Sequence, residues 1–418
     1  MPAITKVKGF PDLFSPESDK YSRMESVARE VFVQYGFQEV RIPVLERTEL
    51  FARSIGDQTD IVQKEMYTFP DRKKRSLTLR PEATAGLVRS FIENKLYARD
   101  LVTKLYTFGP MFRYERPQKG RMRQFHQIDA EIIGTPAPQA DAELLLMLWS
   151  FLQRLEVGQL TLELNSLGCP QCRPAFQQAL NAYLERIDKK ELCQDCLTRS
   201  ATNPLRVLDC KVQQCRTVLE QAPTTMDFLC QDCRVHIETV RELLAQAGIP
   251  YRMNHLLVRG LDYYQRTTFE VVSGAIGSQS SVAGGGRYDT LISDLGGPDV
   301  PALGFACGME RLAMLMQDAA PNRPDFYLAV LDETARNTGV LLAQQLRDKG
   351  FSGEASYEAK SPKSLLRLAN RIGAKTCLLL GPEEMASGKI LVKDMQTGVQ
   401  NMVSQDELEQ ALGLKAQP

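Results

Sequence analysis

Residues 107–131 predict an antiparallel β-hairpin with a basic tip, and this feature constrains the fold more than any other. An apolar first strand reaches a reversal at residues 117–120, and the returning strand places polar side chains at Gln127, Asp129 and Glu131. Near the tip only Glu115 opposes a set of basic residues, so the local field should attract phosphate. These basic residues are Arg113, Arg116, Lys119, Arg121 and Arg123. An ordinary solvated hairpin would show the same pattern, and on this stretch alone it remains open.

The composition limits where nucleic acid could bind. Fifty-one basic and fifty-one acidic residues cancel, so any RNA contact has to be local. The 418 residues suffice for two or three domains with full cores. No run of eighteen apolar residues predicts a membrane span, and the amino terminus lacks the pattern of a secretion signal. We therefore expect a cytoplasmic protein.

Three other stretches carry polar side chains at element boundaries. In residues 80–84 the carboxylate of Glu82 and the hydroxyl of Thr84 follow an apolar strand at the start of a helix, where they could hold an ammonium group. Residues 257–270 place an arginine, an aspartate and two tyrosines in a strand-turn-strand context. Residues 302–312 form a glycine-punctuated strand that leads into a helix carrying Arg311.

In this order and spacing, the stretches resemble the class II aminoacyl-tRNA synthetases, and within them the histidyl-tRNA synthetase family. Residues 112–131 are similar to the second class II motif and residues 304–311 to the third. The helix before Gly36, the strand expected over residues 37–42 and Pro43 resemble the first motif, which in the family forms the dimer interface. Residues 259–264 and 283–289 resemble the two histidine-specific motifs, and the resemblance runs from about residue 5 to the end.

The resemblance implies an α+β catalytic domain with an antiparallel sheet, and a homodimer that acts on ATP, L-histidine and tRNA(His). Histidine would first be activated to histidyl-adenylate and then transferred to the 3′ end of the tRNA. By resemblance, Arg113 and Arg259 hold the α-phosphate, Arg311 lies on the γ-phosphate side, and Arg121 makes a further contact to the triphosphate. Guanidinium groups suit this role because each grips two phosphate oxygens. Mg²⁺ is expected to accompany ATP.

Histidine recognition is also assigned by resemblance. A neutral imidazole has one donor and one acceptor nitrogen, and Glu131 and Tyr264 would contact them, with Tyr263 alongside. Three side chains would hold the amino group: Glu82, Thr84 and Gln127. Asp129 lies outside the contact set usual in the family and is left out. Arg259 is also assigned to the histidine-binding set, and an ion pair with Asp262 or Glu270 is its structural alternative.

Two smaller assignments concern the hairpin. Gln118 and Arg123 match positions that in the family approach the extra guanosine at the acceptor end of the histidine tRNA. His126 is interpreted as a packing residue of the hairpin rather than a base. With no histidine placed to act as the base, a phosphate oxygen of the substrate would accept the proton in the transfer step.

Eight of the ten cysteines fall between residues 169 and 233. The change in composition predicts an inserted, largely helical domain over residues 169–245, which divides the catalytic domain into residues 1–168 and 246–320. Two-residue spacing presents two thiolates to one tetrahedral ion, so we expect two structural zinc sites of four cysteines each. Reduced, partly buried cysteines are the alternative, and spacing leaves the pairing open. The candidate ligands are Cys169, Cys172, Cys193, Cys196, Cys210, Cys215, Cys230 and Cys233.

After a linker marked by Pro321 and Pro324, strands and helices alternate as in an α/β sheet. Residues 325–418 resemble the anticodon-binding domain of the family, although a generic α/β module fits the same pattern. Two other functions remain open. One is the regulatory subunit of ATP phosphoribosyltransferase, whose members usually lack this domain and lose motif residues. The other is a zinc-stabilised RNA-binding module without catalysis, which would leave the histidine motifs unexplained.

Overall fold

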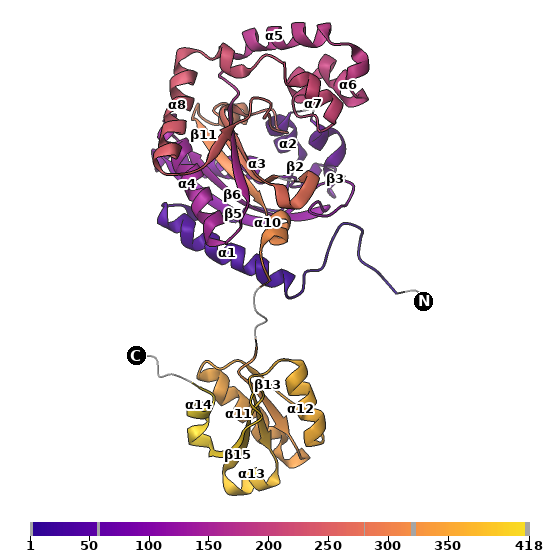
Figure 1. Ribbon diagram of the computed structural model, residues 1–418, viewed down its shortest axis with the longest axis vertical. Coiled ribbons are helices and arrows are strands. Elements are labelled where there is room, and N and C mark those ends of the chain that lie inside the picture. The colour runs from indigo at the N-terminus through magenta and orange to yellow at the C-terminus, as the bar shows by residue number, and fades with distance from the viewer. Residues whose placement is uncertain (1–2, 57–58, 280, 319–322, 414–418) are drawn as a thin grey trace. The chain divides into compact units, whose positions relative to one another are not determined.

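The structure is a computed structural model that describes all residues except 1–2, 57–58, 280, 319–322 and 414–418 (Figure 1). The chain divides into two compact units, Met1–Asp318 and Ala319–Pro418. Among the described residues, no helix combines the length and the apolar character needed to span a bilayer.

The main sheet of the first unit has eight strands in the order β1-β5-β6-β11-β10-β9-β7-β8. The inner strands pair antiparallel, whereas the edge strands β1 and β8 run parallel to β5 and β7. The expected antiparallel sheet is therefore confirmed, and the predicted hairpin supplies β5 and β6. The strands are β1 (Gln38–Glu39), β5 (Thr103–Phe112), β6 (Gln124–Ile133), β7 (Leu160–Ser166), β8 (Tyr251–Met253), β9 (Gln265–Ser273), β10 (Ser281–Arg287) and β11 (Ala302–Gly308).

Helices cover this sheet because apolar side chains repeat along one face of each. On α1 (Glu17–Gln34), Met24, Ala28 and Val31 are fully buried at helical spacing. They join one core cluster with Leu144 and Leu148 of α4. The other helices of this layer contribute to the same core. The covering helices after α1 are α4 (Pro138–Arg154), α8 (Gln231–Gln246) and α10 (Met309–Leu315).

The strand expected over residues 37–42 is shorter than predicted. Only Gln38 and Glu39 pair in the sheet, in parallel with β5. Ile42 instead turns into a separate apolar cluster beside Ala83 and Leu87, which draws the chain away from the sheet edge.

The first unit also contains a three-stranded sheet in the order β2-β4-β3. This sheet contains a hairpin with the charged residues 71–75 at its turn, because β3 and β4 pair antiparallel. The strands of this sheet are β2 (Leu45–Arg47), β3 (Tyr67–Pro70) and β4 (Ser76–Leu79). The remaining helical elements of the first unit outside the cysteine-rich segment are α2 (Thr48–Ile55), α3 (Thr84–Glu93), α9 (Leu291–Asp294), η1 (Ile61–Glu65), η2 (Leu96–Ala98) and η6 (Gly274–Gln279).

The cysteine-rich segment is helical, as expected, and lies at the top of the larger unit in Figure 1. It has its own core, in which Leu180, Cys196, Cys215 and Leu219 are completely buried. Its helices are α5 (Arg173–Arg186), η3 (Lys189–Glu191), α6 (Gln194–Thr202), η4 (Pro204–Val207), α7 (Gln213–Leu219) and η5 (Thr225–Phe228).

The second unit is the expected α/β sheet, in the order β13-β12-β14-β15-β16. Strands β13, β12 and β14 run parallel to one another, and β15 pairs antiparallel with both β14 and β16. Ser404 and Glu407 form a capping box at the start of η8. The elements are β12 (Phe326–Val330), η7 (Glu333–Ala335), α11 (Arg336–Asp348), β13 (Gly353–Ala355), α12 (Pro362–Arg371), β14 (Thr376–Leu380), α13 (Pro382–Ser387), β15 (Lys389–Asp394), β16 (Gln400–Ser404), η8 (Gln405–Glu407) and α14 (Leu408–Ala411).

Candidate active site

One cavity in the first unit gathers most of the side chains that the sequence singled out. Its walls come from the β5–β6 hairpin, the start of α3, residues 259–264, β10, and the junction of β11 with α10. The predicted residues that line it are Glu82, Thr84, Arg113, Arg121, Gln127, Arg259, Tyr263, Tyr264 and Arg311. Segments more than 200 positions apart in the sequence therefore form one site.

Three guanidinium groups of this cavity are held in place by hydrogen bonds or ion pairs with other residues. Arg113 donates from Nε to the carbonyl oxygen of Pro81 at 2.9 Å. Arg311 donates from Nη1 to the carbonyl oxygen of Ser281 at 2.7 Å. Arg121 forms an ion pair with Glu115 at 2.5 Å. Burial, followed by the like charge of Arg121, lowers the pKa of Arg311. The cavity is thus rich in positive charge, which a phosphate chain would neutralise.

Arg259 is held by a carboxylate and fits into a space left by a glycine. Its Nη1 donates to Glu270 at 2.7 Å, so the ion pair considered from the sequence is present in addition to the cavity position. Burial is the largest single influence and lowers the pKa of Arg259, but the charges of Glu270, Tyr264 and Asp209, together with the hydrogen bond to Glu270, outweigh it, so the net shift of the pKa is upward. A Cβ at Gly284 would lie 2.5 Å from the guanidinium atoms. The glycine therefore makes room for this cation.

The three polar side chains of β6 face one side of the sheet, as its alternation requires. Gln127 and Asp129 line the cavity, whereas Glu131 is fully buried and does not line it. Glu131 accepts hydrogen bonds from Thr84 Oγ1 at 2.7 Å and from the Tyr288 hydroxyl at 2.5 Å. The expected direct exposure of Glu131 to substrate is therefore not seen in this structure, because both of its oxygens have protein partners.

Burial dominates the electrostatics of these carboxyl groups. It raises the pKa of Glu131 to about 8, and it raises that of Asp129 well above its usual range, reinforced by the charges of Glu131 and Glu82. Burial also raises the pKa of Glu82, which accepts backbone hydrogen bonds from Thr84 and Ala85 at the start of α3. A cationic ligand would relieve the repulsion among these groups.

Two residues of this site, Asp129 and Tyr288, had no role assigned from the sequence. Asp129 was left out, yet it is 1% exposed, lines the cavity, and its Oδ2 has no hydrogen-bond partner among the described residues. The alternation of Asp129 with Gln127 and Glu131 was the signal that could have included it. Tyr288 had no assigned role, and only the fold shows that its hydroxyl holds Glu131.

At the hairpin tip Arg121 lines the cavity, whereas Gln118 and Arg123 do not. Gln118 and Arg121 close the turn by a backbone bridge, and the Arg123 guanidinium stacks 4.0 Å from the ring centre of Tyr114. His126 contacts Glu310 at 3.2 Å and packs edge-on against Tyr21. These contacts agree with the interpretation of His126 as a packing residue.

Comparison with known proteins extends over nearly the whole chain. A family model of histidyl-tRNA synthetase matches residues 9–312, and one of an anticodon binding domain matches residues 325–413. A histidine–tRNA ligase from Nitratidesulfovibrio vulgaris (strain DP4) is 59% identical over 406 residues, which cover 97% of each protein. The chain belongs to the histidyl-tRNA synthetase family.

Other relatives agree. A histidine–tRNA ligase from Geobacter sulfurreducens is 52% identical over 95% of this chain and 96% of that protein. The crystal structure of apo histidyl-tRNA synthetase from S. aureus is 34% identical with a TM-score of 0.82, covering 98% of this chain and 100% of that one. A Bacillus halodurans structure titled as an ATP phosphoribosyltransferase regulatory subunit/histidyl-tRNA synthetase is 18% identical with a TM-score of 0.65, so it shows the fold alone. The histidyl-tRNA synthetase family is therefore favoured over the regulatory subunit.

Proposed function

We propose that this chain is a histidine–tRNA ligase whose cavity carries out both steps of the reaction. A carboxylate oxygen of histidine attacks the α-phosphorus of ATP, and pyrophosphate leaves. A hydroxyl of the terminal ribose of tRNA(His) then attacks the carbonyl carbon of the adenylate, and AMP leaves. The observation that carries this proposal is that Arg113, Arg259 and Arg311 line one cavity together with Tyr263 and Tyr264.

The cations are assigned to the triphosphate. Arg113 and Arg259 face the α-phosphate, where negative charge gathers in both transition states, and Arg311 and Arg121 take the far phosphates. Preorganised cations in a site that excludes water stabilise such charge most strongly. Mg²⁺ bound to ATP would neutralise part of the phosphate charge, so these side chains need not supply all the positive charge.

The carboxyl groups and tyrosines are assigned to histidine. Glu82, Thr84 and Gln127 hold its ammonium group, and Asp129 adds a second negative charge there. Tyr263 and Tyr264 border the imidazole. Glu131 lies beside this wall and can accept from the imidazole N–H once the Thr84 hydroxyl turns to the substrate. No histidine lines the cavity among the described residues, so we assign the ribose proton to a phosphate oxygen.

The remaining assignments concern the parts of the chain and its partners. Residues 1–168 and 246–320 form the catalytic domain, residues 169–245 the insertion and residues 325–418 the anticodon-binding domain. Gln118 and Arg123 approach the acceptor end of tRNA(His). Residues around α1, β1 and Pro43 form the interface of a homodimer, and the protein acts in the cytoplasm.

The test is the exchange of labelled pyrophosphate into ATP. Histidine should drive the exchange and the other standard amino acids should not, whereas a regulatory subunit would support none. Arg113→Met should reduce the exchange by about 10²- to 10³-fold, because a charge-stabilising donor is lost. Arg116→Met is the matched control, since Arg116 is exposed on the same hairpin outside the cavity. An equal loss in both variants would contradict the assignment.

A further inference from the structure

The fold resolves the cysteine pairing that spacing left open. Of the cysteines in the inserted segment, Cys169, Cys172, Cys230 and Cys233 form one group, the base cluster. The other group, the tip cluster, is Cys193, Cys196, Cys210 and Cys215. Within each group the sulfur atoms all lie within 4.8 Å of one another. We infer that each cluster binds one structural zinc ion, and that the two ions together brace the loop of residues 259–264 against the catalytic cavity.

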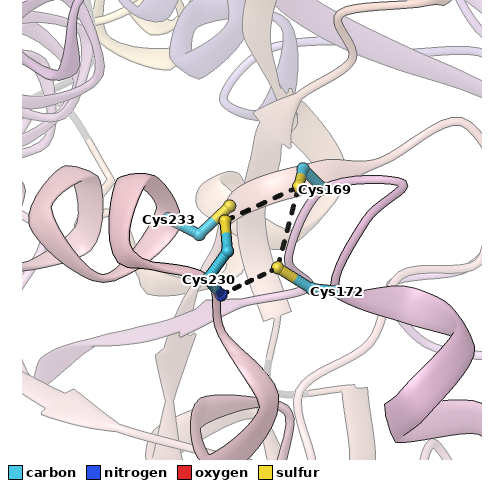
Figure 2. A group of neighbouring side chains, drawn as sticks. All are labelled: Cys169, Cys172, Cys230 and Cys233. Carbon is cyan, nitrogen blue, oxygen red and sulfur yellow. Dashed lines mark hydrogen bonds between the residues drawn. The ribbon is translucent and has the colours of Figure 1, made fainter.

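The base cluster has the dimensions of a zinc site (Figure 2). Cys169 Sγ lies 3.6 Å from Cys172 Sγ and 3.9 Å from Cys230 Sγ. A tetrahedral ion with Zn–S bonds of about 2.3 Å separates its sulfur ligands by about 3.8 Å. The backbone N–H of Cys230 also donates to Cys172 Sγ at 3.1 Å, which stabilises a thiolate there.

The tip cluster repeats this arrangement. Cys193 Sγ and Cys210 Sγ are 3.8 Å apart. The backbone N–H of Cys193 donates to Cys215 Sγ at 3.1 Å, and that of Val212 donates to Cys210 Sγ at 3.4 Å. The recurrence of backbone donors to sulfur in both clusters favours bound thiolates over unreactive buried thiols.

The donor set selects the metal. Four soft thiolates whose sulfur atoms lie within 4.8 Å of one another suit the closed, four-coordinate site that structural Zn²⁺ prefers. Binding one Zn²⁺ to four thiols forms four Zn–S bonds and releases four protons to solvent, with no change of oxidation state. Each ion would stabilise the inserted segment, because a segment of this size forms only a small hydrophobic core.

The base cluster joins the start of the inserted segment, after β7, to the start of α8, which packs in the core of the main sheet. Cys169 and Cys172 follow β7, whereas Cys230 and Cys233 begin α8. Directly after Cys172, the Arg173 guanidinium donates to the carbonyl oxygen of Tyr264. Two backbone bonds lie beside it, from Leu167 N to Arg266 O at 2.7 Å and from Arg266 N to Gly168 O at 2.9 Å. This cluster therefore fixes the end of the loop that carries Tyr264.

The tip cluster supports the beginning of the same loop. Two of its cysteines flank α6 and η4 on the two sides, and these helices carry the contacting residues. Arg206 Nη1 donates to the carbonyl oxygen of Gly260 at 3.0 Å, and Asn203 Nδ2 donates to Asp262 Oδ1 at 3.2 Å. Gly260 directly follows Arg259. The two clusters thus hold both ends of the loop whose side chains line the cavity.

The metal content of the full-length protein, purified without chelators, tests the sites directly. We expect about two zinc ions per chain and no stoichiometric iron. Cys377→Ala is the matched control and should retain two, because Cys377 is buried in β14, outside both clusters. One zinc or less per chain, or stoichiometric iron, would overturn the two-site proposal.

Paired substitutions test the ligand sets. Replacing Cys193 and Cys210 by serine should remove one zinc, because both belong to the tip cluster. Replacing Cys169 and Cys193 should remove both ions, because they belong to different clusters. The reverse pattern would refute the pairing. Since such variants can fail to fold, protein produced with Co²⁺ should also show the visible absorption of tetrahedral tetrathiolate cobalt, and its absence would count against the sites.

The inference that the two clusters hold the loop of residues 259–264 in place rests on the proposed function. It can be tested without removing metal. Arg206→Ala should keep two zinc ions but raise KM for histidine about tenfold in pyrophosphate exchange, with KM for ATP changed less than about twofold. Arg186→Ala, an exposed change at the end of α5, is the control. An unchanged KM for histidine would refute this inference while leaving the zinc sites intact. Absence of exchange in the wild type would refute the proposed function, and the metal count would stand independently.

Discussion

A single methyl group at Gly284 should displace the Arg259 guanidinium and slow histidine activation. Gly284 lies on β10, and its φ angle is outside the left-handed region, so alanine fits the backbone. A Cβ at this position would lie 2.5 Å from Cζ, Nη1 and Nη2 of Arg259, whereas ordinary contact begins at 3.4 Å. The guanidinium therefore has to move by about 1 Å.

The size of the effect follows from that displacement. Misplacing a catalytic group by about 1 Å costs about 10²-fold in rate, which corresponds to about 2.7 kcal/mol of transition-state stabilisation. The shift also pulls Arg259 from Glu270, to which it is hydrogen-bonded at 2.7 Å. We expect a small change in thermal midpoint, because the displaced group is the end of a side chain.

Histidine-dependent pyrophosphate exchange measures the loss. Gly260→Ala is the matched control, since a Cβ there would have no neighbour within 4 Å and Gly260 lies in the same loop as Arg259. In an Arg259→Ala background, Gly284→Ala should cost nothing further, because the group it displaces is absent. Exchange by Gly284→Ala within about twofold of the wild type would refute the reasoning.

Three further predictions concern the same site. Asp129→Asn should raise KM for histidine about tenfold, because a charged partner of the ammonium group is lost, and an unchanged value would place Asp129 away from the substrate. Glu131 has its folded pKa raised by burial from 4.5 to about 8, so its contribution to stability is present below pH 4.5 and is lost as the pH rises toward about 8. The thermal midpoint of the ligand-free protein should fall between pH 4.5 and about 8, and it should depend less on pH in the Glu131→Gln variant. An identical pH dependence in both proteins would disprove this role of Glu131. Arg123→Ala should weaken aminoacylation while adenylate formation stays nearly intact, and equal losses in the two assays would exclude a role at the tRNA acceptor end.

The buried carboxyl groups at and beside the cavity wall favour the binding of a cationic ligand such as histidine. Glu82, Asp129 and Glu131 are all nearly inaccessible to solvent, and burial raises the pKa of each. Keeping three acids together is unfavourable unless they are protonated or a cation binds. The ammonium group of an amino acid is such a cation, so binding should be coupled to proton release.

Local patterns predicted the elements of the fold well. The alternation on β6 indicated which side chains share a face, and the reversal at residues 117–120 indicated the hairpin. The strand expected at residues 37–42 was too long, because local pattern does not show that Ile42 packs in another core.

The amino-acid sequence is enough to identify the chemical groups of the site: the arginines, the acidic residues, the tyrosines and the eight clustered thiols. Motif order and spacing carry that information along the chain. Which of these groups meet depends on the packing of distant segments. The pairing of Cys169 with Cys233, the hydrogen bond from Tyr288 to Glu131 and the place of Asp129 in the cavity all depend on contacts between segments distant in sequence. Such contacts are set by how strands and helices pack, and no local pattern encodes them.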